Sequence, residues 1–255
     1  MAVPTWLFYL VLLLLGLVLG SFYNVCICRL PRKESIIWPG SHCPHCRHPL
    51  TFLDNLPLVS FLLLSGTCRY CHGKISYQYP LVEGLSALLT VFLGWKFGLS
   101  WSFVQGLLLL GVLLVISFID LTHLIIPNVI TYPGMVIGLG FSWLLGSPGW
   151  RASLIGLLLG GGLLFLIYWG HKLITREEGM GLGDVKLLAM IGAFLGWPGV
   201  LVTTIMGSFV GTLVGLPIVI KRKDRKYLFP FGLFLSLGAI IHLFFGTALV
   251  NWYLR

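Results

Sequence analysis

"LLLLGVLLVISFID", residues 107–120, is an apolar run that ends in an acid. With the six residues before it, this run is long enough to cross a bilayer, which takes about 17–25 residues. Similar runs recur along most of the 255-residue chain, in which 57% of the residues are hydrophobic and 10% are charged. Soluble domains carry roughly a quarter charged residues. We therefore expect an all-α polytopic membrane protein.

The apolar runs predict about eight transmembrane helices, of which the sixth is short for a full crossing. Gly156 and Gly160, in the fifth, form a small-xxx-small pattern that predicts close helix packing. Their expected ranges are 5–27, 80–98, 101–120, 127–146, 152–170, 184–197, 199–220 and 228–249.

The basic residues predict the orientation of these helices. If eight helices alternate, 14 of the 17 Lys and Arg residues fall on one side, including those of the segment 221–226. By the positive-inside rule this side is the cytoplasm, so both termini are expected outside. The net charge of +9 is then a topology signal with added attraction to anionic lipid, and we expect no nucleic-acid partner.

One hydrophilic insertion interrupts the helices and divides the chain into a first helix (1–28), the insertion (29–79) and a membrane core (80–255). The insertion contains "SHCPHCRHPL" (41–50) and "TCRYCHGK" (67–74), two C-x2-C pairs separated by 21 residues. Two such pairs predict a tetrahedral zinc site with the ligands Cys43, Cys46, Cys68 and Cys71. Redox pairs or disulfides are the alternatives, and a reducing cytoplasm argues against disulfides.

Four thiolates leave no open position for a water molecule, so the zinc ion is expected to be structural. An insertion of this size is too small to stabilise itself by a hydrophobic core alone. The histidines nearby are alternative ligands, but with four cysteines present they are expected to tune or solvate the site: His42, His45, His48 and His72.

Three of the eight acids adjoin membrane segments: Glu83, Asp120 and Asp184. An acid in the membrane is costly without a partner or a cavity, and is therefore a functional candidate. Asp120 ends an apolar helix, where the helix dipole disfavours negative charge. An interfacial acid facing water is the plainer interpretation of Asp120, and a helix N-cap, paired with Lys186, is that of Asp184.

Helix counting brings Asp120 and Asp184 to the same side of the membrane, which suggests a carboxylate pair. Two neighbouring carboxyl groups share a proton, so one can deprotonate a water molecule while the other protonates a carbonyl or a leaving amine. This is the chemistry of aspartic peptide hydrolysis. From their helix ends we expect Asp120 to start as the acid and Asp184 as the base. Gly181 and Gly183 would let a peptide backbone approach closely.

Several motifs together resemble the type IV prepilin peptidases, which are GxGD aspartic proteases of the membrane. "GLGD" (181–184) matches the family signature, and "FIDLTHLIIPN" (118–128) matches its partner motif. "GSFYNVCICRLP" (20–31), the paired cysteines and "ISYQYPLVEG" (75–84) continue the similarity in the family's order. Asn128 stands where many members have Asp.

The resemblance implies Asp120 and Asp184 as catalytic residues and the four cysteines as metal ligands. It also implies an enzyme of the bacterial inner membrane that removes the basic leader of prepilins or pseudopilins after a Gly, on the cytoplasmic side. Such enzymes serve type IV pili, type II secretion or DNA uptake. The four-cysteine form also N-methylates the new terminus with S-adenosylmethionine, and Gly66 resembles a position linked to methylation.

Methylation has less support from the residues themselves, because no glycine-rich nucleotide loop is present in the sequence. Glu83 is a candidate for orienting the amine, and a packing role is its alternative. Glu177 and Glu178 are candidates for attracting a basic leader. Two further functions stay open, namely a GxGD protease without methyltransferase activity and a transporter that moves protons or cations through the acid pair. The oligomeric state is unknown.

Overall fold

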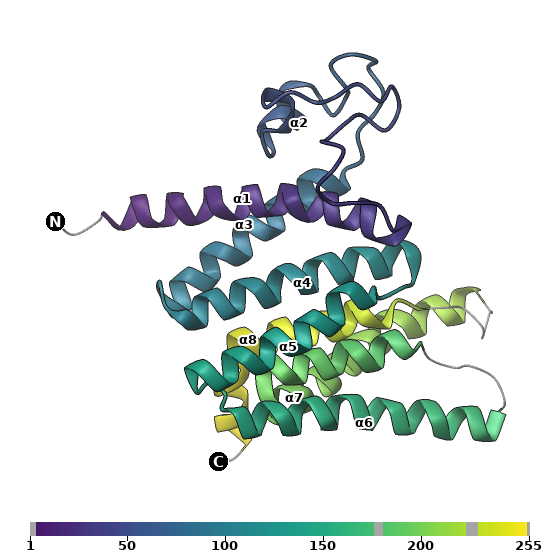
Figure 1. The fold of residues 1–255 in the computed structure, drawn as a ribbon. Coiled ribbons are helices and arrows are strands. Elements are labelled where there is room, and N and C mark those ends of the chain that lie inside the picture. Colours follow the sequence, from purple (N-terminus) through teal and green to yellow (C-terminus); the bar gives the residue numbers. More distant parts are fainter. Residues whose placement is uncertain (1–3, 176–180, 223–228, 254–255) are drawn as a thin grey trace. The chain divides into compact units, whose positions relative to one another are not determined.

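The computed structural model describes residues 4–175, 181–222 and 229–253, and these residues are mostly helical (Figure 1). Their β-structure is limited to the isolated bridges His42–Pro49 and Thr67–Lys74. The α-helices are α1 (Thr5–Arg29), α2 (Val59–Leu63), α3 (Gln78–Phe97), α4 (Trp101–His123), α5 (Asn128–Leu145), α6 (Trp150–Thr175), α7 (Leu182–Arg222) and α8 (Phe231–Tyr253), with short 3-10 helices at Leu30–Arg32 and Leu53–Asn55.

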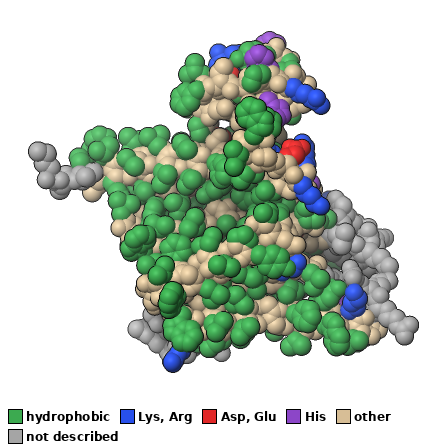
Figure 2. All heavy atoms as spheres, viewed as in Figure 1, with side chains coloured by type: hydrophobic (Ala, Val, Ile, Leu, Met, Phe, Trp, Pro, Cys, Tyr) green, Lys and Arg blue, Asp and Glu red, His purple; other side chains and the backbone are tan. Residues whose placement is uncertain are grey.

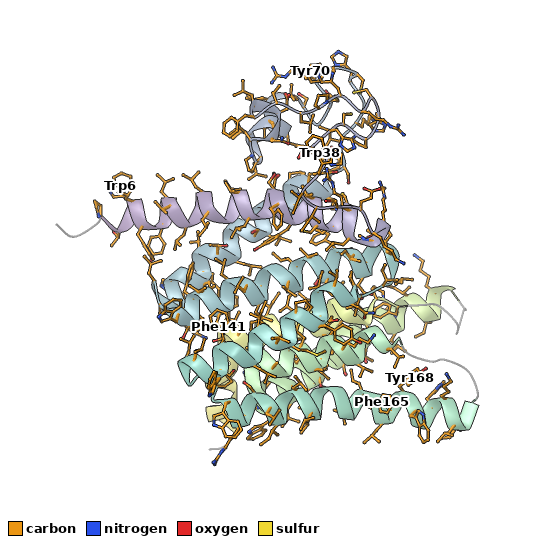
Figure 3. The ribbon with its side chains drawn as sticks, in the orientation of Figure 1. Trp6, Trp38, Tyr70, Phe141, Phe165 and Tyr168 are labelled. Carbon is orange, nitrogen blue, oxygen red and sulfur yellow. The ribbon has the colours of Figure 1, made fainter. Side chains whose placement is uncertain are left out.

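Six helices within the described residues are long and apolar enough to cross a membrane. Their outward side chains are mostly hydrophobic, while His side chains and some of the Lys and Arg side chains lie on the insertion (Figure 2). Trp6, at the start of α1, is 66% exposed and extends away from the helix, as expected of an interfacial anchor (Figure 3). The expectation of an all-helical polytopic membrane protein is therefore confirmed, and the exact number of crossings stays a prediction.

α7 contains both the sixth and the seventh expected helix. The two are joined through Gly196, whose φ of 71° and ψ of −178° are not helical. Pro198 follows two residues later and cannot donate a backbone hydrogen bond, so the chain changes direction here without a loop. The sequence thus predicted two helices correctly in position, but the connection between them is a kink.

The chain divides into two compact units, residues 1–103 and 104–255. In the first unit α1 packs along α3. A Cβ atom on Gly16 would lie 2.5 Å from the Cα of Ala87, and one on Gly20 would lie 2.6 Å from the Cα of Glu83. The two helices can approach this closely only because both positions lack a side chain. The three-part division expected from the sequence stays a prediction.

The second unit is built around α7, which packs against α5, α6 and α8. Its core is a cluster of fully buried side chains that includes Leu113 of α4, Leu188 and Ile191 of α7, and Leu235 of α8. Gly156 of α6 faces α7 so closely that a Cβ there would lie 2.5 Å from the carbonyl oxygen of Gly192. The close packing predicted at Gly156 and Gly160 is confirmed.

The contact between α6 and α7 should be sensitive to a single methyl group. A Cβ on Gly192 would overlap the backbone carbonyl of Gly156, and a backbone atom cannot move aside as a side chain can. We expect Gly192→Ala to lower the free energy of unfolding by about 1–3 kcal/mol, the usual cost of overpacking. Thermal unfolding in detergent measures this.

Gly162→Ala is the matched control, because a Cβ at Gly162 meets no atom within 4 Å. It lies in the same helix as Gly156 and should leave the stability unchanged or raise it slightly, since Ala is the better helix former. Equal stability of the two variants would contradict the close contact.

Candidate active site and metal centre

Asp120 lies near the C-terminal end of α4, and its side chain is buried, with 5% exposed. Its Oδ2 accepts a hydrogen bond of 3.1 Å from the backbone N–H of Leu233, in the first turn of α8. A Cβ on Gly232 would lie 3.0 Å from the same oxygen. The acid that seemed misplaced at the end of α4 therefore caps the N-terminus of α8, where free N–H groups favour a negative charge.

Asp184 is also buried, with 8% exposed, and lies in the first turn of α7. The helix begins at Leu182, two residues before the acid, and the backbone N–H of Asp184 donates to the carbonyl of Gly181. The N-cap interpretation is therefore wrong, because a cap precedes the first helical residue. Asp184 instead adds negative charge to the first turn, which the helix dipole favours.

The two acids lie close enough for their charges to repel each other. Ile126, in the connection between α4 and α5, packs against Gly183 and Gly232. Its side chain lies 3.0 Å from a Cβ built on Gly183 and 2.8 Å from one built on Gly232. The structure thus brings together the starts of α7 and α8 and the end of α4, and the glycines leave room beside both carboxyl groups.

Lys186 does not pair with Asp184. Its Nζ donates a hydrogen bond of 2.9 Å to Oδ1 of Asn128 and lies 5.4 Å from the centre of the Tyr132 ring. This contact connects the start of α7 to the start of α5. Its acceptor, Asn128, is the residue that stands where many members of the resembled family have Asp. Glu177 and Glu178 lie outside the described residues.

The sulfur atoms of Cys43, Cys46, Cys68 and Cys71 all lie within 4.8 Å of one another. The Sγ atoms of Cys43 and Cys71 are 3.8 Å apart. Tetrahedral zinc with Zn–S bonds of about 2.3 Å requires S···S distances of about 3.8 Å. The four cysteines therefore fit a zinc ion in both donor type and spacing. The histidines lie outside this cluster: His45, for example, contacts the carbonyl of Lys74 through Nε2.

The two cysteine pairs have the same backbone structure. The N–H of Cys43 donates to the carbonyl of His48, and the N–H of Cys68 donates to that of Gly73, five residues on in each case. Arg47 and His72, each four residues after its first cysteine, have positive φ values of 57° and 54°. This is a repeated turn that points both sulfurs of a pair at one centre.

The backbone favours a thiolate at Cys68, since the N–H groups of Cys71 and Tyr70 lower the pKa of its thiol to about 7. At Cys71 the N–H of Gly73 acts in the same direction, but the sulfurs of Cys46, Cys68 and Cys43 around it raise its pKa to about 11. Thiolates this close repel one another, and a cation among them would offset that repulsion. Zn²⁺ would supply that charge and hold the two pairs together.

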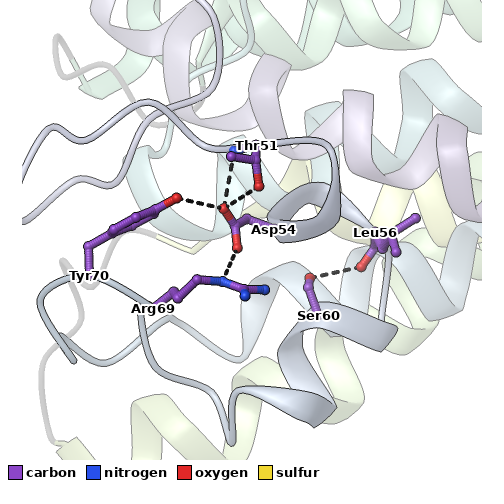
Figure 4. A network of polar contacts seen from close by, with 6 residues as sticks. All are labelled: Thr51, Asp54, Leu56, Ser60, Arg69 and Tyr70. Atoms are coloured by element: carbon purple, nitrogen blue, oxygen red, sulfur yellow. Dashed lines mark hydrogen bonds and ion pairs between the residues drawn. The ribbon is translucent and has the colours of Figure 1, made fainter.

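A polar network supports the second pair from the side (Figure 4). Oδ1 of Asp54 forms an ion pair of 2.7 Å with Nε of Arg69, and Oδ2 accepts hydrogen bonds from the hydroxyl and the N–H of Thr51. The hydrogen bond from the Thr51 side chain holds the pKa of Asp54 below its usual range. The sequence did not predict this network, because no motif or regular spacing connects Asp54 with Arg69.

The two methylation candidates lie in the first unit. Gly66 is buried with a φ of 70°, a conformation that strains any residue with a side chain. The positive φ therefore explains why this position is a glycine. Glu83 is 7% exposed, and its Oε2 accepts a hydrogen bond of 2.8 Å from the N–H of Leu58. The carboxylate is therefore bound to the insertion.

Six candidate membrane-spanning helices, two buried neighbouring aspartates and a four-cysteine cluster together match what is expected of a membrane-embedded aspartic hydrolase. Comparison with known proteins gives the family. Residues 14–97 match the bacterial Peptidase A24 N-terminal domain, and residues 107–216 match the type IV leader peptidase family. The chain belongs to the type IV leader peptidase family.

Proteins named prepilin leader peptidase/N-methyltransferase are similar to the chain over nearly its full length. The protein of Aeromonas hydrophila is 38% identical, covering 98% of this chain and 94% of its own length. That of Pseudomonas aeruginosa is 35% identical, covering 97% and 94%. That of Myxococcus xanthus is 41% identical over 82% of this chain and 63% of its own length. No solved structure matches the chain.

The metal centre predicts how single cysteine variants behave. We expect the purified protein to contain about one zinc ion per chain, and Cys68→Ser to lose most of it because three thiolates and a hydroxyl bind zinc far more weakly. Metal analysis by mass spectrometry measures the content. Cys28→Ser is the control, because Cys28 lies at the end of α1 beside the hydroxyl of Tyr79 and outside the cluster. A zinc-free wild type would disprove the site.

Proposed function

We propose that the protein removes the basic leader peptide from type IV prepilins or pseudopilins and N-methylates the new N-terminal residue. The observation that carries the first activity is the burial of Asp120 and Asp184 within interaction distance, in a chain whose relatives are named prepilin leader peptidases. Family membership favours this function over a transporter. The substrates are prepilins, whose apolar N-terminal helix would enter from the bilayer while the leader stays in the cytoplasm.

In the proposed cleavage step the two aspartates share one proton. The ionised member accepts a proton from a water molecule, which attacks the carbonyl carbon of the scissile peptide bond. The protonated member donates its proton to the carbonyl oxygen. As the tetrahedral intermediate collapses, the first member passes the proton taken from water to the leaving amine, and a hydroxyl proton returns to the second member, so the pair again holds one proton. The glycines Gly181 and Gly183 beside Asp184 would admit the extended substrate backbone.

The sequence assigned the acid role to Asp120 from its position at a helix C-terminus. Asp120 does lie at the end of α4, but its carboxylate also accepts a hydrogen bond from the first turn of α8. Each carboxyl group therefore adjoins the start of a helix, and helix ends do not distinguish the acid from the base. The pair is best treated as one unit that holds one proton between its members.

The cytoplasmic orientation of the site is part of the proposal. It is supported by the basic residues at one set of helix ends, including Arg29 at the end of α1, Arg32 just after it and Lys186 in α7. Arg176 and the segment 223–226 contribute further basic residues to this side, and they lie outside the described residues. An inner-membrane enzyme with its zinc domain in the cytoplasm follows, and it would serve pilus assembly, secretion or DNA uptake.

The proposed methyl donor is S-adenosylmethionine, which supplies the methyl group to the new N-terminal amine. Both aspartates lie in the part that matches the leader peptidase family, so the N-terminal part, 14–97, is the candidate for methyl transfer. The described residues contain no strand followed by a glycine-rich loop, and we assign no binding residue for the donor. Without methyl transfer, the protein would be a leader peptidase alone.

Loss of either aspartate should abolish cleavage. We expect Asp120→Asn and Asp184→Asn each to lower the rate of leader removal about a hundredfold or more, since each deletes one member of an acid–base pair. Purified protein is incubated with a prepilin, and the product is analysed by mass. Glu34→Gln, which changes an exposed acid in the insertion, is the control and should cleave at the wild-type rate. Cleavage by either Asp variant at half the wild-type rate would disprove the pair.

The two activities should respond differently to damage in the insertion. With labelled S-adenosylmethionine in the same assay, we expect Cys68→Ser to remove leaders but to transfer methyl groups poorly, because the loss of zinc loosens residues 41–74. Product mass separates a cleaved from a cleaved and methylated prepilin. Normal methylation by Cys68→Ser would break the link between the insertion and methyl transfer.

A further inference from the structure

Leu58 has a strained backbone conformation. Its φ is 60° and its ψ is −43°, and the N–H of Val59 donates a hydrogen bond of 2.6 Å to the carbonyl of Pro57. This is a γ-turn with positive φ at its centre, the rare and strained form. A branched, bulky residue is unfavourable in this conformation. Such strain persists only where the surrounding structure holds it in place.

Glu83 provides that restraint. Its Oε2 accepts a hydrogen bond of 2.8 Å from the N–H of Leu58, the central residue of the turn. The hydroxyl of Ser21, on α1, is a second partner of the carboxylate. The backbone of Glu83 abuts Gly20, so α1 packs directly against the residue that holds the turn. One buried carboxylate thus connects α1, α3 and the insertion.

The turn leads by short backbone contacts to the second cysteine pair. Leu58 directly precedes α2, and the carbonyl of Phe61 in that helix accepts a hydrogen bond of 2.8 Å from the N–H of Gly66. The carbonyl of Gly66 accepts one of 2.8 Å from the N–H of Ile75. Cys68 follows two residues after Gly66, inside this closed loop. The Leu58 turn is therefore one of the contacts that place the zinc domain on α1 and α3.

We propose that Glu83 is a positioning residue for methyl transfer, which holds the zinc domain on α1 and α3 through the strained turn at Leu58. This inference rests on the proposed methyltransferase activity. It assigns Glu83 no contact with substrate, because its carboxylate is buried and hydrogen-bonded to the protein's own groups. A group that receives the proton of an amine would need a free, accessible oxygen.

Hydrogen exchange at the Leu58 amide tests the geometry without any assay of activity. Exchange is followed by mass spectrometry on a peptide that covers residues 56–63, in the full-length protein in detergent. Glu83→Ala should speed exchange about tenfold or more, as expected for loss of a hydrogen bond to a charged group. Glu83→Gln keeps an acceptor oxygen and should stay near the wild type. Glu34→Ala, which removes an exposed acid, is the control and should change nothing.

Methyl transfer to a cleaved prepilin tests the role. We expect Glu83→Ala to lower its rate about tenfold or more, and Glu83→Gln to stay within about threefold of the wild type. Leu58→Gly in the Glu83→Ala background should restore the rate about threefold or more, because glycine adopts the positive φ without strain. Leader removal should be the same in all variants, since both aspartates belong to the second unit.

Three results would overturn the proposal. The first is loss of methyl transfer in Glu83→Gln with the Leu58 amide still protected, which would show a direct role in the chemistry. The second is normal methyl transfer in Glu83→Ala with the amide unprotected. The third is unchanged exchange in Glu83→Ala. If the wild type cleaves prepilin but does not methylate it, the proposed methyltransferase activity is wrong. The exchange data then decide only whether Glu83 holds the Leu58 turn.

Discussion

The hydrogen bond between the Asp120 carboxylate and the N–H of Leu233 joins the end of α4 to the start of α8, and the acid pair depends on it. A carboxyl group within the apolar part of a membrane protein is costly unless other groups compensate for the lost water. The unsatisfied N–H groups of a helix N-terminus do so. Asp184 lies in the first turn of α7, where the helix dipole favours its negative charge. The candidate active site therefore lies where two helices begin.

The first unit uses its few buried polar groups differently, to fix the insertion to the helices. The guanidinium of Arg29, at the end of α1, donates hydrogen bonds to the carbonyls of Ser35 and Gly40. Glu83 binds the Leu58 turn from α3. These contacts hold a small domain on the helices without a hydrophobic core, and a zinc ion among the four cysteines would add an internal crosslink. The two halves of the chain thus hold separate chemical groups for two proposed activities.

Sequence reasoning succeeded where the signal is local. Apolar runs predicted the membrane helices, because bilayer thickness sets their length. The two C-x2-C pairs predicted that four cysteines gather at one point, and their sulfurs lie within 4.8 Å of one another. An alternative failed where a residue's partner is distant: the plainer interpretation of Asp184 paired it with Lys186, two residues away, but Lys186 contacts Asn128. Sequence spacing indicates only which charged residue is nearest along the chain, whereas the packing of the helices determines which group a side chain contacts.

The sequence by itself determined a helical membrane protein with a four-cysteine insertion and two acids near one face, because length, hydropathy and ligand spacing are properties of short segments. Only the tertiary structure decided what those acids contact. Asp120 meets Leu233, 113 residues away, and Glu83 meets Leu58, 25 residues away. The physical reason is that a buried carboxylate must take its hydrogen-bond donors from whichever helix end or turn packs against it, and that choice is made by the packing of whole helices.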